Sequence, residues 1–237
     1  MSIVGLAERK FPETLRMTYR SILSCLCVLG LVCASGQAAD HRVEPLKEAA
    51  PQADLSEGIA SQLAPTGLRV IRGSTRSVCD IWLCKEWAVK APAKGDDVIY
   101  PFAPGQLIGV VRYARKGSDF RDQDISKGVY TLRYAQQPVN GDHIGTSPTR
   151  DFLLLVKASV DKSVAKIDYK KLTEASAEAV ESTHPGLLSL QRLKGDAPIR
   201  NDEQHDWWIV RLQGKVKMGE VLKSQLLDVV IVGQAAE

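Results

Sequence analysis

The chain has 237 residues with a formal net charge of +3, and 44% of its residues are hydrophobic. Without residues 1–39, 27 basic residues face 26 acidic ones, a net charge of +1. Such a balanced chain has no electrostatic footprint for nucleic acid or for an anionic membrane surface. The remaining 198 residues (237 − 39) are enough for one domain with a single core.

Residues 1–39 are expected to be a secretory signal and not part of the fold. Arg20 precedes a continuous apolar run at residues 21–35, and small residues follow up to Ala39. A basic region, an apolar region and a small-residue cleavage zone in this order are typical of secretory signals. The run is shorter than the roughly 20 apolar residues that a membrane helix needs. We therefore expect an exported protein, periplasmic or extracellular, with no membrane span after cleavage.

Two features of the signal leave alternatives open. Residues 1–15 are charged and contain proline, whereas Met17 begins a more usual signal, so translation is expected to start at Met17. Cys33 is a candidate for lipid attachment, but the large Val32 before it fits the small-residue requirement poorly. A lipid-anchored form is therefore disfavoured.

Cys79 and Cys84 are the cysteines that remain after the signal. An even pair in an oxidising compartment is a candidate disulfide. Residues i and i+5 of a regular strand point to opposite faces and lie about 16 Å apart, beyond disulfide reach. A bond therefore requires a turn or bulge between the two cysteines, and the alternative is two separate buried thiols.

Residues 40–65 contain three prolines and few β-branched or aromatic residues. This composition predicts a flexible tether, with room for one short helix after Asp54. The folded part is then a single domain at residues 66–233.

Short apolar segments separated by turn residues predict a series of strands. Gly109, inside one of the strongest segments, marks a bulge or close packing. Residues 152–157 are apolar on both faces, which is typical of a strand in the middle of a sandwich. The expected extended segments are residues 68–72, 78–89, 98–102, 107–113, 128–135, 152–157, 187–193, 206–212 and 226–232.

Two local signals complete the fold prediction. Gly128 followed by Tyr130 is typical of a sandwich corner, where glycine allows a left-handed backbone and the tyrosine hydroxyl caps nearby backbone. One helix is predicted from Tyr169 to Ser182, with Asp168 as its N-cap and Pro185 beyond its end. The prediction is a mainly β protein, an antiparallel, jelly-roll-like β-sandwich with one packed α-helix.

The loop at residues 141–151, between two core strands, is the main candidate binding site. Loops of this length carry function more often than short ones, and this one contains Asp142, His143, Arg150 and Asp151. In the functional interpretation, His143 is a ligand or proton carrier that Asp142 or Asp151 orients. A purely structural role in bracing the loop is favoured, because a lone histidine is weak evidence.

Histidines and tryptophans provide two further hypotheses. His143, His184 and His205 all lie in turns that flank strands, and they would bind a divalent metal if these turns met. None of the three has the close spacing of a known ligand motif.

Trp207 and Trp208 face opposite sides of one strand, so one of them is a candidate sugar platform. Core packing is nevertheless the favoured role for most of the tryptophans, which include Trp82 and Trp87.

Five segments carry a resemblance to known sequences: Cys84–Trp87, Tyr100–Gly105, Gly128–Leu132, Gly141–Pro148 and His205–Trp208. With them, the chain resembles a family of uncharacterised secreted bacterial proteins that is frequent in planctomycete-type genomes. The resemblance spans residues 68–232 and implies export and a single domain, but no catalytic residue.

The chain contains none of the familiar catalytic motifs: it lacks a nucleophile elbow, a Walker loop, a dinucleotide-binding glycine motif and a Cys-x-x-Cys pair. The sequence therefore favours an exported, non-catalytic protein that binds a small ligand or an envelope partner without a cofactor. The alternatives are a metal-binding protein or metal-dependent enzyme, and a carbohydrate-binding module.

Overall fold

The computed structural model describes residues 40–93, 98–138 and 147–235. They build an eleven-stranded sheet and a separate two-stranded ribbon. The order of the large sheet is β1-β2-β3-β5-β8-β9-β10-β13-β12-β11, and β4 pairs with β12. The pairs are antiparallel apart from β4 with β12. The prediction of a mainly β, antiparallel fold is confirmed.

The elements have the following bounds. The large sheet contains β1 (His41–Leu46), β2 (Gly67–Arg72), β3 (Arg76–Leu83), β4 (Trp87–Ala88), β5 (Leu107–Tyr113), β8 (Gly128–Gln136), β9 (Asp151–Lys157), β10 (Leu187–Gln191), β11 (Ile199–Asp202), β12 (Trp207–Met218) and β13 (Val221–Val232). The ribbon consists of β6 (Gly117–Ser118) and β7 (Asp124–Ile125). The helical segments are the 3₁₀ turn η1 (Gln52–Asp54), α2 (Glu57–Gln62) and α3 (Tyr169–Ala179).

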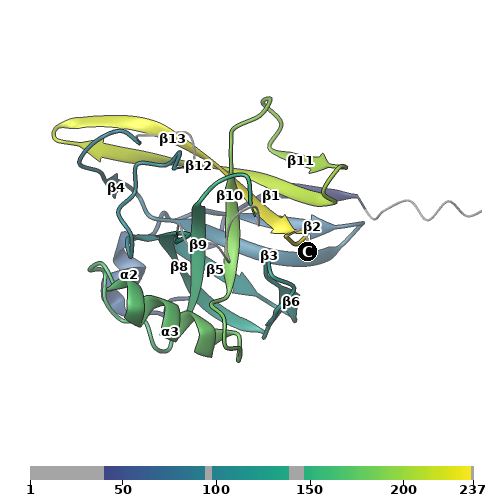
Figure 1. Ribbon diagram of the computed structural model, residues 1–237, viewed down its shortest axis with the longest axis horizontal. Coiled ribbons are helices and arrows are strands. Elements are labelled where there is room, and N and C mark those ends of the chain that lie inside the picture. Colours follow the sequence, from purple (N-terminus) through teal and green to yellow (C-terminus); the bar gives the residue numbers. More distant parts are fainter. Residues whose placement is uncertain (1–39, 94–97, 139–146, 236–237) are drawn as a thin grey trace, which may run out of the picture. The chain divides into compact units, whose positions relative to one another are not determined.

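The large sheet bends into two layers at β10, whose first residues pair with β9 and whose last residues pair with β13 (Figure 1). β10 to β13 form a Greek key, because β13 returns to lie beside β10. At the far end of the sheet, the His41 ring in β1 lies 4.6 Å from the Trp208 ring in β12, centroid to centroid. The sheet is therefore nearly closed, as in a sandwich of barrel-like form.

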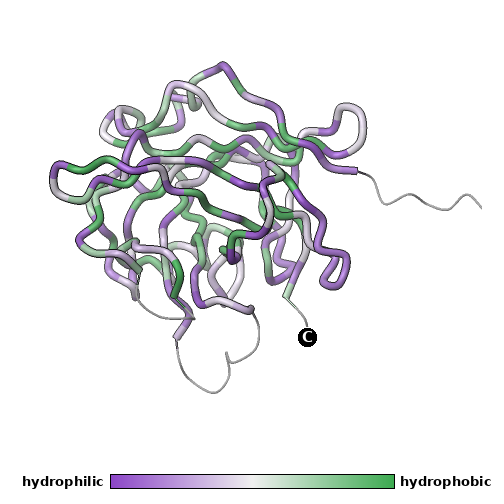
Figure 2. The backbone as a smooth tube through the Cα atoms, turned by 90° about the horizontal axis from the view of Figure 1, so that it is seen from above, coloured by the Kyte–Doolittle hydropathy of each residue, from purple (hydrophilic) through white to green (hydrophobic). Residues whose placement is uncertain are grey.

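Strand β9 shows how the core is arranged. Leu153 and Leu155 belong to the main core between the layers, whereas Phe152, Leu154 and Val156 belong to two smaller clusters on the outer face. Both faces of β9 are buried, as the sequence predicted. In Figure 2, green apolar stretches run through the middle of the tube, and many of the outer bends are purple.

Residues 40–65, predicted to be a flexible tether, belong to the fold. β1 pairs with β2 from His41 opposite Arg72 to Leu46 opposite Gly67, and α2 confirms the short helix expected in this segment. The tether prediction was wrong because a few apolar residues are enough to hold a segment in the fold when they can pack against an existing sheet. The buried apolar residues of the segment are Leu46, Ala50, Leu55, Ile59 and Leu63.

Most expected strands are confirmed, with ends that shift by a few residues. The pairing of β5 with β8 shifts between Leu107 and Gly109, and a Cβ on Gly109 would lie 2.3 Å from the carbonyl oxygen of Trp82, so the predicted bulge and close packing are both present. Residues 98–102 form no strand. The β12–β13 hairpin is longer than expected, and β11 was not predicted.

The corner at the start of β8 is confirmed in one part and corrected in another. The Tyr130 hydroxyl donates to the carbonyl of Ser126 over 2.8 Å, which is the expected cap. Gly128 does not have a positive φ, so its expected left-handed conformation is wrong. A Cβ at this position would instead touch the Tyr130 ring at 3.4 Å.

Helix α3 begins where its cap predicted. The Asp168 carboxylate accepts the amides of Lys170 and Lys171, and Leu172 is buried beneath the helix. The helix ends at Ala179, before the expected Ser182. Among the described residues, no helix combines the length and apolarity needed to cross a membrane.

Cys79 and Cys84 form no disulfide; both are free and buried. β3 continues without a turn from Arg76 to Leu83, so the two sulfurs are kept apart, as the strand geometry implies. Burial raises the pKa of the Cys84 thiol to about 12 and raises the pKa of Cys79 further. Of the two alternatives that the sequence left open, the disulfide is not formed and the two separate buried thiols are confirmed.

Candidate functional site

The predicted binding loop is described only at its end. Asp142 and His143 lie outside the described residues, so their role stays a prediction. The Arg150 guanidinium donates to the carbonyl of Gln137 from Nε over 2.9 Å and from Nη2 over 2.7 Å. Arg150 therefore ties the two ends of the loop together.

Asp151 is fully buried and serves as an anchor. Its carboxylate accepts the amides of Ile99 and Tyr100 over 2.9 and 3.2 Å, and the Tyr134 hydroxyl over 2.5 Å. Burial and then the bond to Asp151 raise the pKa of Tyr134, so this hydroxyl remains a donor. The arrangement fastens the segment before β5 onto β8 and β9, which is a structural use of Asp151.

The histidines are not gathered into a metal site by the described part of the chain. Nδ1 of His205 lies 3.2 Å from the Asp202 carboxylate, and the His205 ring stacks on Trp207 with centroids 4.4 Å apart. His184 lies in the turn after α3, where it lines a groove that is described below. Within residues 40–93, 98–138 and 147–235, no three His, Cys, Asp or Glu side chains could hold a metal together. Any part played by His143 stays a prediction.

The tryptophans do not form a sugar-binding platform. Trp82, Trp87 and Trp207 are buried, and Trp208 is half-buried against His41. The indole N–H groups of the three buried rings donate to backbone carbonyls. Because none of the four tryptophans is largely exposed, the condition that a carbohydrate module requires is not met.

A groove of about 470 Å³ lies between α3 and the ends of β8 and β9, and we call it the helix groove. This volume is within the range of small-molecule sites. Its floor is apolar, because it lies where the two clusters on the outer face of the sheet meet. The floor residues are Phe120, Ala135, Phe152, Leu154 and Leu187.

The walls of the helix groove are held in place by hydrogen bonds. On one side, Asp119 is buried, and its carboxylate accepts the amides of Arg121, Gln123 and Leu187, each within 2.9 Å. The amide of Phe120 donates to the carbonyl of Leu187 over 2.9 Å. This turn therefore places the Phe120 ring firmly at the groove. On the other side, α3 forms the wall.

Polar groups occur at the rim of the groove and not on its floor. Tyr169 and Thr173 come from α3, His184 from the following turn, and Gln136 and Gln137 from the end of β8. Arg121 and Asp122, of opposite charge, come from the turn that Asp119 braces. Burial raises the pKa of Tyr169, so its hydroxyl stays protonated at neutral pH. An apolar floor, surrounded by donors and acceptors whose charges balance, suits a small, mostly apolar ligand that these groups orient.

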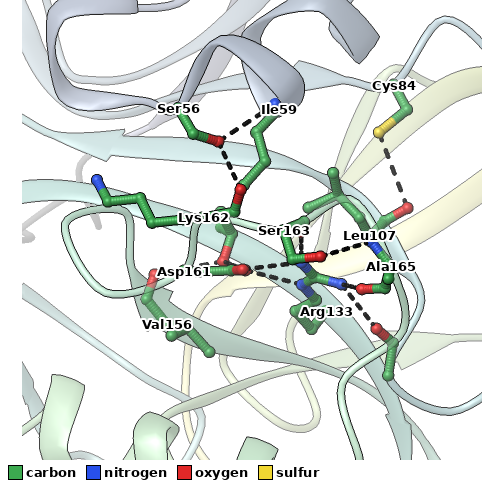
Figure 3. A network of polar contacts seen from close by, with 12 residues as sticks. Ser56, Ile59, Cys84, Leu107, Arg133, Val156, Asp161, Lys162, Ser163 and Ala165 are labelled. Atoms are coloured by element: carbon green, nitrogen blue, oxygen red, sulfur yellow. Dashed lines mark hydrogen bonds and ion pairs between the residues drawn. The ribbon is translucent and has the colours of Figure 1, made fainter.

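A second set of polar residues is buried and structural (Figure 3). Arg133 is fully buried and binds both oxygens of Asp161 over 2.8 and 2.9 Å, and its remaining N–H groups donate to the carbonyls of Gly105, Ser163 and Ala165. The Thr131 hydroxyl also donates to Asp161, over 2.6 Å. The network fastens the loop before α3 to the outer face of β8.

Sequence reasoning missed the helix groove. Its floor residues come from four separate segments, and their meeting depends on tertiary packing. The sequence of β9 could have indicated the groove. Phe152 and Leu154 lie on the face of β9 opposite the main core, and because they are apolar they require a second layer that covers them. No protein-family model, curated protein or solved structure matches the chain.

Proposed function

We propose that this chain is an exported, non-catalytic binding protein that holds a small, uncharged and largely apolar ligand in the helix groove. The observation that carries the proposal is the groove itself, about 470 Å³ with an apolar floor and a polar rim whose two charged side chains, Arg121 and Asp122, have opposite signs. Sites of this kind bind by burying apolar surface, and a few polar contacts set the orientation of the ligand.

The buried ionisable groups support a non-catalytic role, because structural contacts already occupy them. Asp80 pairs with Arg69 and Arg112, and Asp228 pairs with Arg200 and Arg211. An acid–base catalyst works best with a pKa near the working pH and a free path to its substrate. Carboxylates that are enclosed by two guanidinium groups are suited to holding strands together.

Export is supported by the N-terminal sequence pattern and by the resemblance to secreted bacterial proteins. Arg20, the apolar run at residues 21–35 and the small residues up to Ala39 are in the order of a secretory signal. Burial of Cys79 and Cys84 suits an oxidising compartment, because buried thiols with raised pKa values resist oxidation.

The test uses N-phenyl-1-naphthylamine, an uncharged aromatic probe whose fluorescence rises in apolar sites. We expect saturable binding to the purified protein, and a loss of affinity of about tenfold or more in Thr173→Trp, which fills the groove from its rim. Glu178→Trp is the matched control, because Glu178 is exposed on the same helix and does not line the groove.

Equal binding by the two variants would refute the groove as the site. Stoichiometric metal in the purified protein that is lost in His143→Ala would instead support the metal-binding alternative.

A further inference from the structure

A second cavity, the hairpin cleft, lies between the β12–β13 hairpin, the start of β2 and the end of β3. Its volume is about 730 Å³. In Figure 1, the β12–β13 hairpin projects past the other strands. The cleft and the helix groove share no lining residue. An inference about the cleft therefore does not rest on the proposed function.

One edge of β12 is open along the hairpin cleft. β11 pairs with residues 207–210 of β12, and β4 pairs with residues 216–217 on the same side. Among the described residues, no strand pairs with residues 212–215 on this side. The sheet therefore has a gap between β11 and β4.

The direction of the backbone groups in this gap follows from its two ends. The amide of Arg211 donates to the carbonyl of Pro198 over 2.9 Å, and the carbonyl of Lys217 accepts the amide of Val89 over 2.9 Å. Backbone groups alternate in direction along a strand, so those of Gln213 and Lys215 point to the same side. The amide and carbonyl of Gln213 and the amide of Lys215 face the position that an added strand would occupy, whereas the carbonyl of Lys215 faces Trp87 of β4.

The walls of the cleft continue the main core. Ile81 and Leu212 belong to that core and are buried, and Leu68 and Leu83 pack against it. All of them line the cleft. A ligand in the cleft can therefore bury apolar side chains while its backbone pairs with β12.

The charged groups along the cleft are positive. Lys85, Lys215 and Lys223 line it, and no aspartate or glutamate does. Lys215 and Lys223 have no ion-pair partner in the described part of the chain. Arg211 also lines the cleft, but its charge is compensated by Asp228 at 2.7 Å. This arrangement is electrostatically complementary to an acidic ligand.

We propose that the hairpin cleft binds an extended acidic peptide segment, which adds a strand to the open edge of β12 at Gln213 and Lys215. Strand addition obtains its affinity from backbone hydrogen bonds and its specificity from alternating side-chain contacts. An acidic amphiphile would satisfy the lysines and the apolar walls, but it would leave the amides of Gln213 and Lys215 and the carbonyl of Gln213 without partners. The open strand edge therefore favours the peptide.

The probe is a fluorescein-labelled peptide of alternating glutamate and valine, with a lysine–valine peptide as the counterpart. In fluorescence polarisation we expect the acidic peptide to bind with a Kd below about 100 µM and the basic peptide not to bind. Lys215→Glu combined with Lys223→Glu should weaken binding by about tenfold or more. Lys127→Glu is the matched control, because Lys127 is exposed and does not line the cleft.

Hydrogen exchange tests the backbone contact directly. Bound peptide should slow exchange at the amides of Gln213 and Lys215, and Gln213→Pro should abolish binding while the thermal midpoint stays near that of the wild type. Absence of binding by the acidic peptide, or unchanged exchange at both amides in its presence, would overturn the proposal. Displacement of the peptide by sodium laurate without protection of these amides would assign the cleft to an amphiphile. If Gln213→Pro fails to fold, the lysine variants and the exchange data still decide.

Discussion

Replacing Asp161 by asparagine tests the buried network that holds the loop before α3. The side chains of Arg133 and Asp161 are 0% and 2% exposed, so the substitution leaves a guanidinium charge buried without its counter-charge. Breaking a buried ion pair in this way costs about 3–5 kcal/mol. The carbonyls of Gly105, Ser163 and Ala165 still accept hydrogen bonds from Arg133, so we expect the lower end, about 3 kcal/mol.

The assay is urea denaturation at pH 7, followed by circular dichroism and analysed for the free energy of unfolding. Asp124→Asn is the control, because its ion pair with Lys116 joins side chains that are 67% and 69% exposed. Such surface pairs contribute less than about 1 kcal/mol. Equal losses of stability in Asp161→Asn and Asp124→Asn would refute the reasoning that burial makes the first pair important.

Three further predictions address a turn, a buried histidine and the thiols. Gly105 has φ +80°, and a Cβ there would lie 2.0 Å from a backbone carbonyl oxygen, so Gly105→Ala should lower the free energy of unfolding by about 3 kcal/mol or more. Gly73 has φ +62° but open space around it, so Gly73→Ala should lower the free energy of unfolding by only about 1 kcal/mol. Burial holds the pKa of His41 below its usual 6.5, so protonation of His41 is less favourable in the folded chain than in the unfolded chain. The contribution of neutral His41 to stability is therefore complete above about pH 6.5 and is lost as the pH falls below it. His41→Phe should therefore make the stability less dependent on pH between about 7.5 and 5. Iodoacetamide at about pH 8 should label Cys79 and Cys84 in urea but not in the native protein, as peptide mass mapping would show.

Each of these predictions has a result that would contradict it. Equal costs for the two alanine variants would mean that contact with the carbonyl does not restrict Gly105. An unchanged pH profile in His41→Phe would mean that His41 titrates alike in the folded and unfolded chains. Rapid labelling of Cys84 in the native protein would show that the hairpin cleft exposes its thiol.

Elements with local signals were predicted well. The Asp168 side chain caps α3, Tyr130 reaches the backbone four residues before it, and Gly109 lies where the pairing shifts. Each signal depends on residues that are close in sequence, or on alternation within one strand. For this reason the helix start, the tyrosine cap at the corner and the central strands could be predicted without knowledge of their neighbours.

Predictions that depended on distant partners were less successful. Residues 40–65 looked like a tether because their composition was judged alone, but Leu46 and Ile59 belong to the main core, which residues outside this segment largely form. The sequence left open whether Cys79 and Cys84 are bonded, because a bond required a turn or bulge between them, and pairing with β2 and β5 keeps β3 extended. In both cases the missing information was which surface the segment meets.

The sequence by itself determined that the chain is built from strands, where α3 begins, and that β9 needs cover on both faces. Tertiary structure decided the use of each polar residue: Asp151 became a buried anchor, and Arg133 became the centre of a structural ion pair. It also decided where the helix groove and the hairpin cleft lie, because both are lined by segments far apart in the chain. The physical reason is that periodicity shows which face of an element is apolar, whereas a site depends on which faces meet and which backbone groups remain unpaired when they do.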